Sequence, residues 1–338
     1  MTNVSIMLDE IYPRLFLEII PEALQIKNSD YQNLINGQKN DQSFSSRYGV
    51  LISKVYEYDP NSNIGLQFGK YLWPQTLCDY SRIIVSSSDV RSAFGLINKV
   101  HHIHGASYYP FTSIKNGVFS LALCFPFKDV VSANQRRFCI EAVLSYMANA
   151  LKATTNREFR PLRVCFDFPE PSYLKEYQSL FGGNITFDSP INMIEFDDSY
   201  LSTPLSTSSS TLYSMYLKKS SGEWRKKARQ EDDFERMVVS CMLNHYPNSF
   251  DCSELARRMN LSVRGLQKKL TKHGVTFSQL VNRVRRELTK KYLFQEQLSI
   301  DKTADVLGFQ SRSGFTRFFK AEFNSTPLEF LDSNPIAA

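Results

Sequence analysis

Two nine-residue segments near the C-terminus repeat one arrangement of capping, apolar and polar residues. Residues 262–270 read SVRGLQKKL and residues 311–319 read SRSGFTRFF, and the two align without a gap at an offset of 49 positions. Each begins with a Ser, which can cap a helix, and carries apolar residues at its fifth and ninth places. Because places four apart share one face of a helix, each segment is predicted to be a short helix with that face inward.

The opposite face of each predicted helix carries side chains that can bind DNA bases. Its members are the second, third, sixth and seventh residues of each segment: Val263, Arg264, Gln267 and Lys268 in the first, and Arg312, Ser313, Thr316 and Arg317 in the second. Arg and Lys bind guanine, Gln binds adenine, Ser and Thr bind either, and Val can contact a thymine methyl. The alternative is contact with phosphate alone, which positions a protein without reading sequence. Gly265 and Gly314 interrupt these helices at a cost of ~1 kcal/mol each relative to Ala, which close approach of a partner would explain.

The elements around the two segments predict a pair of helix-turn-helix units. The first unit is expected at residues 252–273 and the second at residues 300–323, each with a short helix, a turn and the helix that carries one repeated segment. A helix over residues 277–296 joins them and is about 30 Å long, close to the roughly 34 Å between successive major-groove faces. Its basic residues are predicted to face outward: Arg283, Arg285, Arg286, Lys290 and Lys291.

Charge is distributed unevenly along the chain. The whole sequence holds 40 Lys+Arg and 34 Asp+Glu, for a formal net charge of +6. Residues 1–217 hold 18 basic and 20 acidic residues, whereas residues 218–338 hold 22 basic and 14 acidic ones. Residues 250–320 alone hold 15 basic and 6 acidic residues. This excess favours a polyanion such as nucleic acid as the partner of the C-terminal region, and a solvated helical surface is the alternative.

Composition predicts a domain boundary before this basic region. Residues 202–211 (STPLSTSSST) are rich in Ser and Thr, and residues 218–233 (KKSSGEWRKKARQEDD) are polar and charged. Because such sequence cannot bury a core, it is predicted to connect domains. We therefore expect an N-terminal domain over residues 1–217, a linker over residues 218–232 and a C-terminal domain over residues 233–338.

Residues 234–332 also carry an ordered series of short motifs. They are Leu255-Ala256, Leu266-Gln267-Lys268, residues 283–287 (RVRRE), Ile300 with Ala304, Gly308-Phe309, residues 311–319 with Phe323, and Thr326-Pro327. This series resembles the DNA-binding domain of the AraC/XylS family of bacterial transcription regulators. The sequence departs from the family pattern at Asn324, where glycine is usual, at Lys268, where arginine is commoner, and at Asp305. These departures leave the hydrophobic frame intact and affect only the expected base preference.

The resemblance implies an all-α C-terminal domain in which two helix-turn-helix units are bridged by a long helix. It implies that this domain binds double-stranded promoter DNA through the outward residues of both recognition helices: Arg264, Gln267, Lys268, Arg312, Ser313, Thr316 and Arg317. It also implies RNA polymerase as a partner and transcriptional regulation, most often activation, as the function.

The N-terminal residues predict an α/β or α+β fold. Residues 11–19 and 135–151 have the periodicity of helices, and residues 118–127 and 163–168 that of strands. Segments at residues 64–69 (IGLQFG), 163–171 (RVCFDFPEP), 177–183 and 192–204 resemble the N-terminal effector domain of the subgroup related to regulators of ornithine and arginine metabolism. The resemblance implies a domain that binds a small effector of unspecified identity and supports a homodimer.

No pattern indicates catalysis, a cofactor or a metal. His101, His102 and His104 beside Tyr108 and Tyr109 could form a metal or anion site, or one wall of an effector pocket. Because no carboxylate or Cys completes a ligand set, a solvated loop end with packed aromatic residues is expected. The six cysteines are scattered and are predicted to be reduced and mostly buried. Phosphate-loop, nucleophile-elbow and zinc-protease motifs are absent from the sequence. We therefore expect a protein that is not an enzyme.

Two alternative functions fit parts of the same sequence. One is a DNA-reading module fused to an enzyme, such as a repair methyltransferase with a reactive cysteine, although Cys124 and Cys165 lie in apolar, strand-like stretches. The other is a regulator without an effector that a partner protein controls.

Length and hydropathy set the remaining expectations. A chain of 338 residues with 42% hydrophobic residues is long enough for two folded domains. No apolar run approaches the ~18 residues of a membrane span, and the first ten residues contain Asp9 and Glu10 but no Lys or Arg. These features predict a cytoplasmic protein that does not bind membranes.

Overall fold

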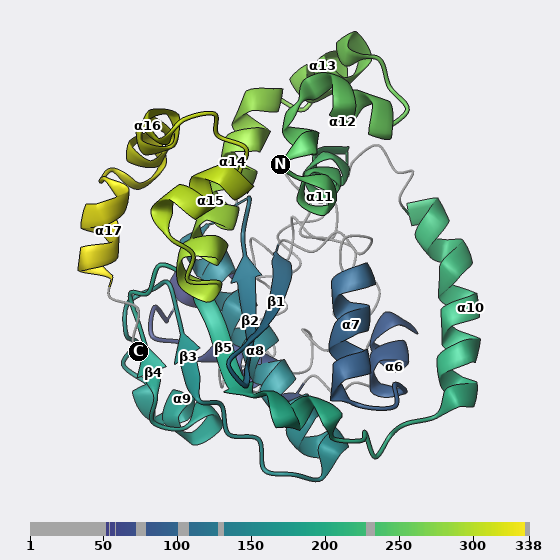
Figure 1. Ribbon diagram of the computed structural model, residues 1–338. Coiled ribbons are helices and arrows are strands. Elements are labelled where there is room, and N and C mark those ends of the chain that lie inside the picture. The colour runs from purple at the N-terminus through teal and green to yellow at the C-terminus, as the bar shows by residue number, and fades with distance from the viewer. Residues whose placement is uncertain are drawn as a thin grey trace. The chain divides into compact units, whose positions relative to one another are not determined.

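The computed structural model describes residues 52–53, 55–57, 59–71, 79–100, 108–127, 132–227 and 234–334. They form two compact units: most residues up to 227 belong to the first, and residues 234–334 belong to the second (Figure 1). The predicted helix at residues 11–19 and the cluster of His101, His102 and His104 lie outside the described residues. No helix within the described ranges is both long enough and apolar enough to cross a membrane.

The described residues of the first unit form a five-stranded mixed sheet with the order β1-β2-β5-β3-β4 (Figure 1). The strands are β1 (Tyr109–Lys115), β2 (Val118–Cys124), β3 (Arg163–Cys165), β4 (Ile185–Thr186) and β5 (Asn192–Asp197). β5 pairs antiparallel with both β2 and β3, whereas β3 pairs parallel with β4. Asn116 and Gly117 join β1 to β2 with φ values of 52° and 79°, the left-handed conformation that tight hairpin turns require.

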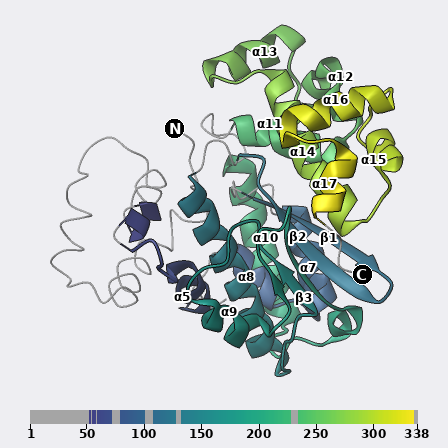
Figure 2. The ribbon, with the colours of Figure 1, turned by 90° about the vertical axis from the view of Figure 1, so that its left-hand side faces the viewer.

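Helices accompany this sheet, so the predicted mixed α and β character is confirmed. They are α5 (Ile64–Tyr71), α6 (Asp79–Val85), α7 (Val90–Val100), α8 (Ala133–Thr155), α9 (Leu174–Phe181), the 3-10 helix η3 (Asp198–Ser202) and α10 (Ser210–Lys227). α8 contains the predicted helix at residues 135–151 and begins at a capping box in which Ser132 and Gln135 bond to each other's backbone N–H. Figure 2 shows α5, α8 and α9 on the same side of the sheet.

Two glycines allow α5 to pack unusually close to α8. A Cβ atom at Gly69 would lie 2.4 Å from the backbone oxygen of Ala142, and one at Gly65 would lie 2.4 Å from Glu141 Oε2. Both separations are shorter than any van der Waals contact, so any side chain at these positions would force the helices apart.

A buried carboxylate of α8 ties this helix to α9. Glu141 is fully buried, and its Oε1 accepts hydrogen bonds from Arg137 Nε at 2.9 Å, Tyr173 OH at 2.8 Å and Tyr177 OH at 2.5 Å. Burial raises the pKa of the Glu141 carboxyl, and its partnership with Arg137 opposes that rise. The carboxylate is thus satisfied within the fold.

The segment expected to be a linker begins as a helix. α10 (Ser210–Lys227) covers the first ten residues of the predicted linker at residues 218–232. Tyr213 and Tyr216 of α10 pack against buried Ile83 and Leu96, which anchors the start of the helix on α6 and α7. A polar composition does not prevent a helix here because Lys, Arg and Glu are good helix formers.

The second unit is helical throughout its described residues, as predicted (Figure 1). Its elements are α11 (Phe234–His245), the 3-10 helix η5 (Asn248–Phe250), α12 (Cys252–Arg258), α13 (Val263–Lys272), α14 (Phe277–Lys290), the π-helical turn η6 (Lys291–Gln295), α15 (Ile300–Val306), α16 (Arg312–Phe323) and α17 (Pro327–Ser333). α12 with α13 and α15 with α16 form the two helix-turn-helix units, and α14 with η6 is the helix that joins them.

Candidate DNA-binding surface

The first helix-turn-helix unit holds α13 by its cap and by two buried leucines. Ser262 Oγ accepts a hydrogen bond of 3.0 Å from the backbone N–H of Gly265. Asn260 makes the turn before it with φ 54°, a conformation that Asn tolerates better than most residues. Leu266 and Leu270 are buried beneath the helix, so the opposite face of α13 is the face that points to solvent.

The second helix-turn-helix unit repeats this construction around α16. Ser311 Oγ accepts a hydrogen bond of 3.2 Å from the backbone N–H of Gly314. Gly308 makes the turn with φ 73°. Phe315 and Phe319 are fully buried in the positions that Leu266 and Leu270 occupy in the first unit. The two repeated segments are therefore both recognition helices with the predicted inward and outward faces.

The turn of the second unit is longer than that of the first by one residue. The backbone N–H of Leu261 bonds to the oxygen of Ala256 at 2.8 Å, and that of Phe309 bonds to the oxygen of Ala304 at 3.0 Å. These equivalent bonds are offset by 48 positions, whereas the recognition helices are offset by 49. Gln310 is the additional residue, and it falls in the turn, where an insertion disturbs neither helix.

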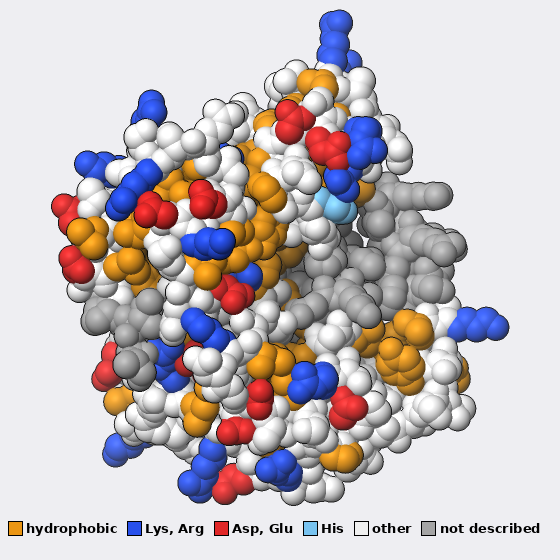
Figure 3. All heavy atoms as spheres, viewed as in Figure 1, with side chains coloured by type: hydrophobic (Ala, Val, Ile, Leu, Met, Phe, Trp, Pro, Cys, Tyr) orange, Lys and Arg blue, Asp and Glu red, His pale blue; other side chains and the backbone are white. Residues whose placement is uncertain are grey.

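The predicted DNA-contacting residues lie on the outward faces of α13 and α16. Six of the seven are exposed, and Thr316 is half-buried: Arg264, Gln267, Lys268, Arg312, Ser313, Thr316 and Arg317. Figure 3 shows Lys and Arg side chains projecting from the surface over α13 and over α16. Outward side chains above a buried apolar pair are the arrangement with which a recognition helix enters a major groove.

Most of these side chains have no partner of their own within the described part of the chain. Arg264, Gln267 and Lys268 on α13, and Arg317 on α16, make no side-chain hydrogen bond or ion pair with another described residue. Arg312 Nε lies 3.4 Å from Asp301 Oδ1 in a largely exposed pair, which holds the guanidinium only weakly. Ser313 Oγ lies 3.1 Å from the capping Ser311 Oγ. The unpaired side chains can therefore form new hydrogen bonds without breaking existing ones.

The glycines inside the recognition helices lie close to the capping serines. A Cβ atom at Gly265 would lie 3.1 Å from Ser262 Oγ, and one at Gly314 would lie 3.3 Å from Ser311 Oγ. Each glycine donates its N–H to that same hydroxyl. Both separations are tight, but the hydroxyl would have to shift by only a few tenths of an ångström to admit a side chain, and Gln135 occupies the equivalent position after the Ser132 cap of α8. The caps therefore do not require glycine, and close approach of a partner stays a prediction.

None of the five basic residues of the joining helix is exposed, so their predicted outward orientation is wrong: Arg286 and Lys291 are buried, and Arg283, Arg285 and Lys290 are half-buried. Arg286 is 5% exposed and its Nη1 lies 3.4 Å from Glu322 Oε2 of α16. Lys291 is 9% exposed and its Nζ lies 3.1 Å from Glu296 Oε1. The joining helix contacts both helix-turn-helix units, so it is covered on several sides. The periodicity of one apolar face does not reveal this coverage. These cations hold the domain together rather than extending its DNA-binding surface.

Arg285 is held between two aromatic rings. One ring comes from the chain before the joining helix and the other from the chain after it. Its guanidinium lies 4.9 Å from the ring centre of Phe250 and 4.3 Å from that of Phe309. Burial lowers the pKa of the guanidinium, which nevertheless stays positively charged because the ordinary value is so high. Beside it, a Cβ atom at Gly308 would lie 2.9 Å from Pro247 Cβ. These contacts fix the second turn against the segment that precedes the first unit.

Nothing in the sequence marked Arg285 for this role. Its two aromatic partners lie 35 positions before it and 24 positions after it, and neither spacing belongs to a helical or strand repeat. The stack depends on tertiary structure, whereas the repeated segments were found because their spacing is local.

The described cysteines do not have the environment of reactive thiols. Cys124, Cys139, Cys165, Cys241 and Cys252 are all free, and Cys124 and Cys165 are buried. Burial raises the pKa of the Cys139 thiol to about 12, and it also raises the pKa values of Cys241 and Cys252. A nucleophilic cysteine requires the opposite shift. Across the described ranges, no three His, Cys, Asp or Glu side chains gather as metal ligands would.

Comparison with protein families separates the chain into the same two parts. Residues 45–205 match the family described as the arabinose-binding domain of AraC transcription regulator, N-terminal. Residues 255–333 match the family described as a helix-turn-helix domain.

Individual proteins are similar over shorter stretches. The ornithine utilization regulator of Pseudomonas aeruginosa is 25% identical over 197 residues, which is 58% of this chain and 58% of that protein. The HTH-type transcriptional activator FapR of Escherichia coli is 26% identical over 97 residues, or 29% of this chain and 37% of that protein. The chain thus spans less than two thirds of the length of either relative. The crystal structure of the transcriptional regulator CdpR from Pseudomonas aeruginosa covers 93% of this chain and 98% of its own with a TM-score of 0.44 at 15% identity.

Proposed function

Because the chain belongs to the AraC family of DNA-binding transcription regulators, we propose that it activates transcription at specific promoters under the control of a small effector. Its C-terminal helices bind DNA, and its N-terminal unit is of a ligand-binding type. The family consists of regulators, so the alternative of a fused enzyme is dropped. Activation is supported by the name of one relative, the activator FapR.

The observation that carries the proposal is that the exposed faces of α13 and α16 carry polar side chains without partners among the described residues. α13 presents Arg264, Gln267 and Lys268, and α16 presents Arg317, above apolar pairs that are buried. We assign base contacts to the seven outward residues: Arg264, Gln267, Lys268, Arg312, Ser313, Thr316 and Arg317. The joining helix, α14 with η6, is 19 residues long, or about 28 Å at 1.5 Å per residue. Two adjacent major grooves, about 34 Å apart, are therefore a suitable target for one chain.

Selection of bound duplexes from a random library by the full-length chain tests this assignment. We expect a preferred site with two conserved blocks about one helical turn apart. Gln267→Ala should relax the preference within one block and Arg317→Ala within the other. A library that stays random after repeated selection would contradict sequence-specific binding.

Transcription in vitro tests the regulatory part of the proposal. The selected site is placed upstream of a promoter and transcribed by bacterial RNA polymerase with and without the protein. More transcript in the presence of the protein is the expected result, and less transcript would make it a repressor. If a purified partner protein, and no small molecule, changes the output, control by a partner replaces control by an effector.

We further propose that the chain forms a homodimer through α10. Leu212 and Met215 are 42% and 50% exposed although both are apolar, and Figure 3 shows apolar side chains over the lower part of α10. Water-exposed apolar side chains on an anchored helix favour a second copy as a partner. Sedimentation of the full-length chain should give a dimer, and Met215→Glu should shift it toward monomer. A wild-type monomer at tens of micromolar would contradict the proposal.

A further inference from the structure

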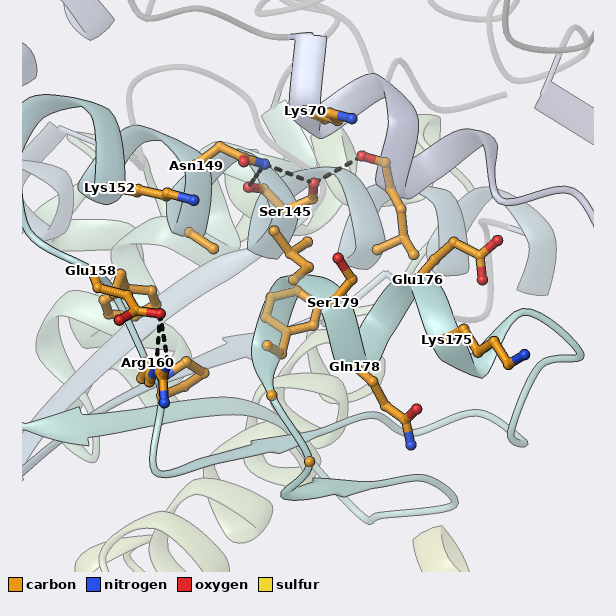
Figure 4. A pocket seen from close by; sticks show the side chains of 18 of the residues that line it. Lys70, Ser145, Asn149, Lys152, Glu158, Arg160, Lys175, Glu176, Gln178 and Ser179 are labelled. Atoms are coloured by element: carbon orange, nitrogen blue, oxygen red, sulfur yellow. Dashed lines mark hydrogen bonds and ion pairs between the residues drawn. The ribbon is translucent and has the colours of Figure 1, made fainter.

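A cavity in the first unit has the size and chemistry of a ligand site. It has a volume of about 780 Å³ and lies among α5, α8, α9 and the segment at residues 158–161 (Figure 4). Small-molecule sites commonly measure roughly 300–1,000 Å³. All of its lining residues belong to this one unit and are described.

The charges around the cavity favour an anion. Lys70 of α5, Lys152 of α8 and Lys175 of α9 line it, and none of the three makes an ion pair with another described residue. Arg160 Nη2 lies 2.8 Å from Glu158 Oε1, so these two lining charges neutralise each other. Glu176 is the remaining carboxylate in the lining. The lining therefore carries three such lysines against one such carboxylate, and this excess of positive charge favours an anion.

Lys70 and Lys152 are best placed for the charged group. Figure 4 shows them on the side of the cavity where Asn149 and Ser145 also lie, whereas Lys175 lies at the other end. One comes from α5 and the other from α8, the pair of helices that Gly65 and Gly69 allow to pack closely. A carboxylate or phosphate between these two ammonium groups would be bound from both helices at once.

Some polar oxygens of the lining can accept hydrogen bonds from a ligand. Asn149 Nδ2 donates to the backbone oxygen of Ser145 at 2.8 Å, so its Oδ1 is the atom that remains to accept. Ser145 Oγ already donates to the backbone oxygen of Leu66 at 2.8 Å. Ser179 points from α9 toward the same space in Figure 4. A ligand with hydroxyl groups could donate to the Asn149 and Glu176 oxygens and exchange hydrogen bonds with Ser179.

We propose that this cavity binds the effector and that the effector is a small organic anion that carries hydroxyl groups. The inference rests on the proposed function, because it names the site and the chemical class of the effector already proposed. Leu66, Ala148, Phe159 and Phe181 supply a mostly buried apolar floor for the carbon skeleton. Binding stabilises the folded unit, because the ligand binds only where the three helices are packed together.

Calorimetric titration and thermal unfolding of the full-length chain test the proposal. The probes are D-gluconate, D-galacturonate and D-glucose 6-phosphate, with uncharged D-glucose and cationic L-ornithine as comparison compounds. At least one of the anions should bind and raise Tm, and both comparison compounds should bind at least tenfold more weakly. Lys70→Gln with Lys152→Gln should weaken binding of that anion at least tenfold. Arg91→Gln, which removes an exposed cation of α7 outside the cavity, should leave its affinity unchanged.

A second variant separates loss of the cavity from loss of charge. Ser179→Trp places a large side chain at an exposed position of the lining and should abolish binding while Tm without ligand stays near the wild-type value. The proposal is overturned if none of the three anions binds, if D-glucose or L-ornithine binds equally well, or if the double lysine variant keeps full affinity. DNA binding by the same preparation is measured in parallel, so an inactive cavity in a chain that binds DNA leaves the proposed function standing.

Discussion

Two arginines of the C-terminal domain differ in whether their guanidinium groups are free to contact DNA. Arg317 stands exposed on α16 with no partner among the described residues, and it is free to donate two parallel hydrogen bonds to a guanine. The guanidinium of Arg285 instead packs between the rings of Phe250 and Phe309. Substitution of Arg317 should therefore change sequence preference, whereas substitution of Arg285 should change the stability of the domain.

Arg317→Ala should act on sequence preference. We expect a loss of roughly 1–3 kcal/mol on the selected site and a relaxed preference at one base pair. Lys320→Ala removes another exposed cation of the same helix and should weaken binding to specific and random duplexes about equally. Titration of each variant against both duplexes measures the difference. Equal losses for Arg317→Ala on the two duplexes would show that Arg317 contacts phosphate only.

Arg285→Lys should act on geometry while the charge is kept. A lysine cannot stack as a planar guanidinium does, so we expect the domain to lose about 1–2 kcal/mol of stability and DNA affinity to fall. The dependence of log K on log salt should stay unchanged, because the number of cations is the same. Thermal unfolding and a salt titration measure the two quantities. A salt slope that changes by about one would mean that Arg285 contacts DNA directly.

At the scale of elements, the close packing of α5 on α8 depends on glycine. Gly69→Ala would place a methyl group 2.4 Å from the backbone oxygen of Ala142, and backbone cannot give way as a flexible side chain can. We expect a loss of stability of ~2 kcal/mol or more, in the range of other overpacked sites. Chemical denaturation of the full-length chain measures the effect.

Gly95 provides the matched control for that substitution. It lies within α7, and a Cβ atom there would meet nothing within 4 Å. Gly95→Ala should therefore stabilise the unit by about 0.5–1 kcal/mol, because alanine loses less backbone entropy in a helix. If both variants lost stability equally, glycine's small size would not be what matters at Gly69.

Elements were predictable from sequence where their determinants are local. The capping serines Ser262 and Ser311 and the apolar pairs that follow them lie within nine residues, and these two recognition helices were found in full. α10 was missed because composition indicated a connection, while helix propensity and the anchoring of Tyr213 and Tyr216 favour a helix. The π-helical turn η6 could not be foreseen, since its bonds to residues five positions back leave no mark on the apolar periodicity.

At the scale of the whole molecule, charge assigns the polyanion to one end of the chain. Residues 218–338 carry 22 basic and 14 acidic residues, whereas residues 1–217 are slightly acidic. If the two recognition helices and their flanks contact about six phosphates, affinity should fall by roughly 10³ between 50 and 200 mM salt. A salt titration of the full-length chain on the selected site measures the slope, and Lys320→Ala should reduce it by about one. A slope near zero would contradict electrostatic binding.

The sheet of the first unit marks the limit of prediction at this scale. The predicted strands at residues 118–127 and 163–168 start at the same residues as β2 and β3. The sequence did not indicate that β5 lies between these two strands in the sheet. Such pairing joins residues that are far apart in the chain, for example Val118 with Asp197 and Arg163 with Glu195. The cavity among α5, α8 and α9 follows from the same long-range packing, so no motif could have located it.

The one-residue difference in length between the two turns lies outside the recognition helices, so it leaves their caps and buried pairs equivalent. Gln310 absorbs the extra length outside both helices, and the caps and buried pairs of α13 and α16 coincide position for position. The outward residues of one helix could therefore be transplanted onto the other without altering its foundation. If these residues contact bases as proposed, exchanging them on one helix should change the preference in one block of the binding site and leave the other block unchanged.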